Sequence, residues 1–142
     1  MKTILSCCVL GVALLACTPL FAHHGTGASY QMDKTVTLKG TVTDFLWSNP
    51  HCAISLDVMQ ADGTIVHWVA ETHPPGMLKL GGWTKSTLKP GDQITIVVNP
   101  SKAGTPIGDT FSIVLPDGKE QSRAQMAGNG GRGQAGGRGD GQ

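Results

Sequence analysis

The sequence predicts an all-β protein, a small five-stranded OB-like barrel with a short helical connection between strands 3 and 4 and a disordered Gly-rich tail. Five segments show the two-residue alternation of half-buried strands, and turn-forming residues separate most of them. Their order, three strands, a short helical connection and two more strands, is that of an OB-type barrel. A β-sandwich is the alternative, but five strands are few for two full sheets.

The first strand is expected over residues 36–43, where apolar and polar residues alternate. Phe45 and Trp47 continue the alternation in the opposite phase. This change of phase predicts a bulge near Gly40 or Asp44, as in the strongly bent first strand of a small barrel.

The second and third strands are expected over residues 51–59 and 64–71, joined by a tight turn in which Gly63 is free to adopt positive φ. If Gln60 and Thr64 close a three-residue loop, the register of this hairpin follows. Ala53 then faces Glu71, Asp57 faces His67, and the apolar residues of both strands share the inner face.

The rest of the barrel follows from shorter patterns. Residues 77–80 and 84–88 are each expected to form a short helical turn. Two final strands are expected from apolar alternation, which involves Ile94, Ile96 and Val98 on the fourth and Phe111, Ile113 and Leu115 on the fifth.

The chain is expected to consist of a signal peptide (1–22), an N-terminal arm (23–34), the barrel domain (35–119) and a disordered Gly-rich tail (120–142). Lys2, a short apolar run and a small residue at Ala22 are typical of an export signal, and the run is too short to span a membrane. Cleavage after Ala22 predicts a periplasmic or secreted protein. The alternative is a protein that is lipid-anchored through Cys17, because Leu14-Leu15-Ala16-Cys17 resembles a lipobox.

Composition excludes several classes of function. The formal net charge of +1 gives no steering toward nucleic acid, so no nucleic-acid partner is expected. Cleavage leaves Cys52 as the one cysteine, which is expected to be buried, in a monomer, rather than to act as a dimerising thiol. No phosphate-binding loop, Gly-x-Ser-x-Gly motif or catalytic arrangement of serine, histidine and acid occurs, so the protein is not expected to be an enzyme.

The histidines predict a metal site. The hairpin register places His51 opposite His73 and next to Glu71, close enough for a shared ion. After cleavage His23 and His24 begin the chain, and the amine and imidazole of His23 form a chelate suited to copper or zinc. In the competing interpretation His51 caps a turn, His67 only pairs with Asp57, and no metal is bound.

The aromatic residues suggest a second kind of binding. OB-type barrels often bind oligosaccharides or nucleic acid on one face, and such a face is the expected place for a glycan or protein partner. Trp68 and Trp83 are nevertheless expected to belong to the core, because tryptophan is highly buried on average.

Several motifs resemble a family of small exported bacterial proteins catalogued only as a domain of unknown function, the 6152 family. The most distinctive are His23-His24 and Trp47-Ser48-Asn49-Pro50-His51, followed by Gly82-Trp83-Thr84 and the segment 88–92. The resemblance implies a secreted or periplasmic β-barrel and no particular activity. The chain departs from the family pattern at His73 and in its glycine-rich tail.

Two hypotheses about function follow. In the first, the protein is a small exported binding module that holds copper or zinc through His23, His24 and His51, with Glu71 and His73 as further ligands. In the second, it is a structural or interaction domain of the bacterial envelope that binds a protein or glycan partner.

Overall fold

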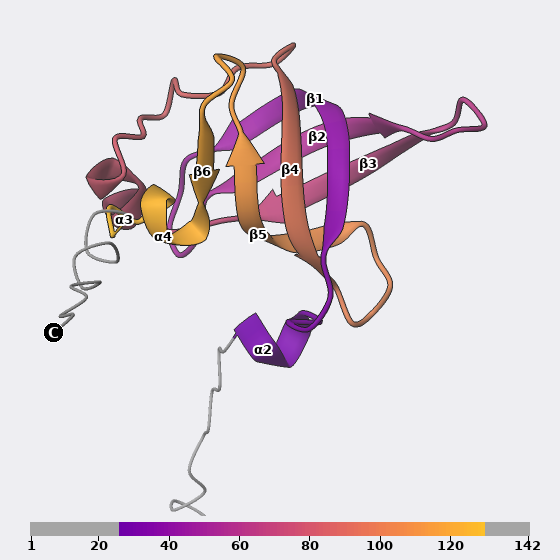
Figure 1. The fold of residues 1–142 in the computed structure, drawn as a ribbon, viewed down its shortest axis with the longest axis horizontal. Coiled ribbons are helices and arrows are strands. Elements are labelled where there is room, and N and C mark those ends of the chain that lie inside the picture. The colour runs from indigo at the N-terminus through magenta and orange to yellow at the C-terminus, as the bar shows by residue number, and fades with distance from the viewer. Residues whose placement is uncertain (1–25, 130–142) are drawn as a thin grey trace, which may run out of the picture.

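The computed structural model describes residues 26–129, which form one sheet of six strands and three short helices, two of which lie together at one end of the barrel (Figure 1). The expected signal peptide, Cys17, His23-His24 and residues 130–142 lie outside the described residues. The elements in chain order are α2 (Thr26–Ser29), β1 (Val36–Leu46), β2 (Ala53–Met59), β3 (Ile65–Glu71), α3 (Pro75–Leu80), β4 (Gln93–Pro100), β5 (Ile107–Val114), β6 (Glu120–Ser122) and α4 (Arg123–Met126).

The first five strands close into a barrel, which confirms the predicted fold class. The strand order is β3-β2-β1-β4-β5-β6, and a parallel pairing of β3 with β5 closes the ring. In this pairing Val69 lies beside Ile107 and Glu71 beside Asp109. Closure therefore brings the end of β3 next to the start of β5, at the end of the barrel that carries the candidate site.

The predicted bulge in β1 is present near Asp44. The register of β1 with β2 shifts between Val42 and Asp44. The first half of β1 pairs with β4 and the second half with β2, so one bent strand belongs to both sides of the barrel. Gly40 lies at the crowded part of the bend, where an added Cβ would be 2.6 Å from the Asp57 carbonyl oxygen.

The predicted register of the β2–β3 hairpin is confirmed. Ala53 pairs with Glu71 and Asp57 with His67. The Gln60 N–H donates to the Thr64 carbonyl at 2.8 Å, and Gly63 has a φ of 84°. The ladder begins at Ala53, so His51 lies just before β2 rather than in it.

The prediction that Phe111, Ile113 and Leu115 share the apolar face of the fifth strand is only partly correct. The register of β4 with β5 shifts between Val97 and Val98, and Phe111 has no partner in this pairing. Thr110 (1% exposed) and Ile113 (0%) consequently point into the protein, whereas Phe111 is 51% exposed. A bulge reverses the side-chain alternation, which strand periodicity alone does not reveal.

The predicted boundary between the barrel domain and a disordered tail at residue 120 is wrong, because residues 120–126 form β6 and α4. Met126 is fully buried in the core, and the Trp83 indole N–H donates to the buried Gln121 side chain. Ser122 begins α4 with a capping box. The segment is mostly polar, and its single buried methionine produces no periodic pattern in the sequence.

The barrel interior holds most of the residues that the sequence assigns to the core. Trp83 is 2% exposed, and its ring meets Phe45 edge-on with centroids 5.9 Å apart. Trp68 packs partly buried against the same cluster. Cys52 is fully buried, as expected. Among residues 26–129, no helix has the length and apolar character needed to cross a bilayer.

Candidate functional site

A cavity of about 210 Å³ opens at the end of the barrel where β3 ends and β5 begins. We call it the polar pocket. Its walls come from the segments just before β2 and just after β3, from β5, and from the two helices α3 and α4. The lining residues are His51, Glu71, Thr72, His73, Pro74, Met77, Asp109, Thr110 and Arg123.

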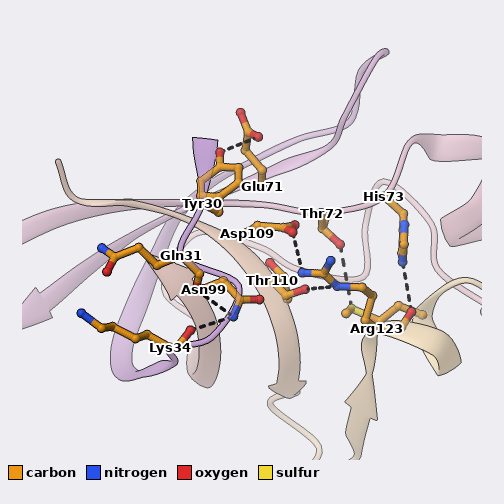
Figure 2. A network of polar contacts seen from close by, with 11 residues as sticks. Tyr30, Gln31, Lys34, Glu71, Thr72, His73, Asn99, Asp109, Thr110 and Arg123 are labelled. Carbon is orange, nitrogen blue, oxygen red and sulfur yellow. Dashed lines mark hydrogen bonds and ion pairs between the residues drawn. The ribbon is translucent and has the colours of Figure 1, made fainter. Parts of the chain in front are cut away.

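An ion pair forms one wall of the polar pocket (Figure 2). Arg123 at the start of α4 donates from Nη2 to Asp109 Oδ2 at 2.5 Å and from Nε to the Thr110 carbonyl at 3.0 Å. Burial raises the pKa of Asp109 above its ordinary value despite the Arg123 guanidinium, and the nearby Glu71 carboxylate adds to the rise. The pair also ties α4 to β5.

Tyr30 orients the second carboxylate of the pocket. Its hydroxyl donates to Glu71 Oε2 at 2.7 Å, as Figure 2 shows. Burial and the Glu71 carboxylate raise the pKa of Tyr30, so the hydroxyl stays protonated and acts as a donor. Lys102 holds the preceding segment through bonds to the carbonyls of Ser29 and Gly27. The N-terminal arm therefore reaches the barrel at the edge of the pocket.

The hydrogen bond of His73 determines its tautomer when the imidazole is neutral. His73 Nε2 lies 3.0 Å from the Arg123 carbonyl oxygen. A carbonyl oxygen only accepts hydrogen bonds, so Nε2 carries the proton. Nδ1 then keeps a lone pair, which makes it the nitrogen able to bind a cation.

Three of the five predicted metal ligands, His51, Glu71 and His73, line the polar pocket. His23 and His24 lie outside the described residues. His67 is elsewhere, 2.6 Å from Asp57 on the exposed hairpin. Within residues 26–129, no three histidine, cysteine, aspartate or glutamate side chains form a group that could hold a metal ion.

Six of the nine pocket residues are not predicted from the sequence: Thr72, Pro74, Met77, Asp109, Thr110 and Arg123. Asp109 and Thr110 precede the apolar alternation that marks the fifth strand, and Arg123 lies in the segment expected to be disordered. For Met77 the sequence indicates only a helical turn. Its spacing of four residues from His73 is the one available signal.

An apolar groove adjoins the polar pocket and shares His73, Met77 and Arg123 with it. Its volume is about 400 Å³, and the bulged Phe111 lies along it together with Ala127 and Asn129 of the C-terminal segment. The bulge thus places Thr110 in the pocket and Phe111 in the groove.

Together, the barrel and its pocket define a small β-barrel protein with a polar cavity at one end. A family model described as a family of unknown function, DUF6152, matches residues 12–110, and the chain belongs to this family. No curated protein and no solved structure matches the chain significantly.

Proposed function

We propose that this protein is an exported, non-enzymatic binding module that holds a transition-metal ion, copper or zinc, at the polar pocket. The observation that supports the proposal is that His51, Glu71 and His73 line one cavity. Imidazole and carboxylate are suitable ligands for both ions.

The charge of the pocket favours a cation. Glu71 and Asp109 contribute two negative charges and Arg123 one positive charge, so the sum is −1 with ionised carboxyls and neutral histidines. Asp109 is already paired with Arg123, whereas within the described part of the chain the Glu71 side chain accepts a hydrogen bond only from a neutral donor, the Tyr30 hydroxyl. Glu71 therefore remains the carboxylate that a bound cation would neutralise.

Hydrogen bonds outside the proposed coordination shell support the same assignment. Metal-binding histidines usually donate their second N–H to a carbonyl or carboxylate, and ligating carboxylates are themselves hydrogen-bonded. His73 has such a bond to the Arg123 carbonyl, and Glu71 has one from Tyr30. Both side chains are thus held with one ligand atom still available.

Because the described residues supply no complete group of three ligands, the proposal includes His23 and His24. His24 precedes Tyr30 by six residues, a length that spans up to about 20 Å when extended. Tyr30 itself contacts Glu71. Export with cleavage after Ala22 would free the His23 amine, whose pKa of about 8 permits coordination near neutral pH.

The test is a titration of the mature protein, residues 23–142, with Cu(II) and with Zn(II), followed by calorimetry and thermal unfolding. We expect one ion per chain and a rise in the melting temperature. His51→Ala, His73→Ala and an acetylated amino terminus should each weaken binding by at least about tenfold, since each removes a ligand.

His67→Ala is the matched control, because His67 lies on the exposed hairpin and pairs only with Asp57 among the described residues. It should bind metal like the wild type. A melting temperature that neither ion changes would refute metal binding and favour a protein or glycan partner. Binding that survives all three site changes would refute this site. Intact mass of the exported protein tests cleavage, which a diacylated Cys17 would contradict.

A further inference from the structure

We propose that the polar pocket is selective for Cu(I), with the Met77 thioether as a ligand beside His73. This inference rests on the proposed metal-binding function and names the ion. Met77 is absent from the ligand set that the sequence predicts, which contains only histidine and glutamate.

The position of Met77 carries the proposal. Met77 lies in α3, four residues after His73, and its backbone N–H donates to the Pro74 carbonyl at 3.0 Å. The short connection through Pro74 returns the chain over the cavity, so that both side chains line it. Met77 is 37% exposed, which leaves its side chain accessible to an ion.

A comparison with Met126 shows why the thioether of Met77 is the one suited to bind an ion at the polar pocket. Met126 is fully buried, and its sulfur lies 3.9 Å from the Thr72 hydroxyl. Met77 lies instead where the polar pocket meets the apolar groove. The groove would shelter a metal–thioether bond from water on one side.

The ligand chemistry distinguishes Cu(I) from zinc. Thioether sulfur is a soft ligand that selects Cu(I), whereas zinc sites use thiolate, imidazole and carboxylate. His73 Nδ1 and the imidazole of His51 supply the nitrogen donors; no side chain among residues 26–129 hydrogen-bonds to the His51 ring. A set of one thioether and two imidazoles fits a low-coordinate Cu(I) ion.

The experiment is an anaerobic competition for Cu(I) between the mature protein and the chromophoric chelator bicinchoninate. We expect Met77→Leu, which keeps the size and apolar character of the side chain, to weaken Cu(I) binding by at least about tenfold. Zn(II) affinity should be unchanged. Met59→Leu is the control, because Met59 is 70% exposed at the hairpin tip, away from the pocket.

X-ray absorption at the copper edge gives a second readout. The wild-type Cu(I) complex should show a sulfur neighbour that disappears in Met77→Leu. If Zn(II) or Cu(II) binds at the pocket but Met77→Leu leaves Cu(I) affinity and the spectrum unchanged, this inference is overturned while the proposed function stands. If no ion binds the wild-type protein, the Cu(I) inference and the proposed metal-binding function are both refuted.

Discussion

Replacing Met126 with alanine tests whether the C-terminal segment belongs to the folded domain. Met126 is fully buried, and core Met→Ala substitutions cost about 2–5 kcal/mol. For a domain of this size 1 kcal/mol lowers the melting temperature by about 4–8 °C, so Met126→Ala should lower it by at least about 8 °C. The loss arises from a cavity beside Thr72 and from weaker docking of α4.

The assay is thermal and urea unfolding of the mature protein, followed by circular dichroism. Met59→Ala provides the matched control, since Met59 is 70% exposed and surface substitutions usually change stability by less than about 0.5 kcal/mol. Equal melting temperatures for the two variants would refute the reasoning, because they would show that α4 contributes nothing to the core.

Two further predictions concern the packing around this segment and the single cysteine of the barrel. Gly81→Ala should destabilise the protein, because the added Cβ would clash with the Met126 carbonyl oxygen, whereas Gly76→Ala should not, because the space around Gly76 is open. Chemical denaturation compares the two variants, and equal midpoints would contradict the docking of α4 against Gly81. Cys52 should resist Ellman's reagent in the native mature protein and react once it is unfolded, because the thiol is fully buried and burial raises its pKa. Stoichiometric labelling of the native protein would contradict this prediction.

The hairpin shows how much of the site the sequence determined. The register of β2 with β3 follows from loop length and from the apolar face that the strands must share, because a slip of one residue would expose that face. These two local constraints are enough to place Ala53 opposite Glu71, and the structure confirms the pairing. The same local rules predict that His51 and His73 lie near Glu71, and all three residues line the polar pocket.

The remaining walls of the pocket were decided by tertiary structure. Asp109 reaches Glu71 only because β5 closes the barrel in parallel against β3, a contact between segments far apart in the chain. Arg123 reaches Asp109 only because the C-terminal segment folds back onto β5. Neither contact can be predicted from local sequence patterns. The burial of the ion pair and of Met126 depends on surfaces that form only when the barrel closes.

The Phe111 bulge illustrates the same division at the level of one residue. Alternation in the sequence predicts that Phe111, Ile113 and Leu115 share a face. The register shift against β4 turns Phe111 outward and places Thr110 inside. Sequence periodicity determined that a strand forms there, and strand pairing decided which side chains face the pocket, because an unpaired residue reverses the alternation without changing the local composition.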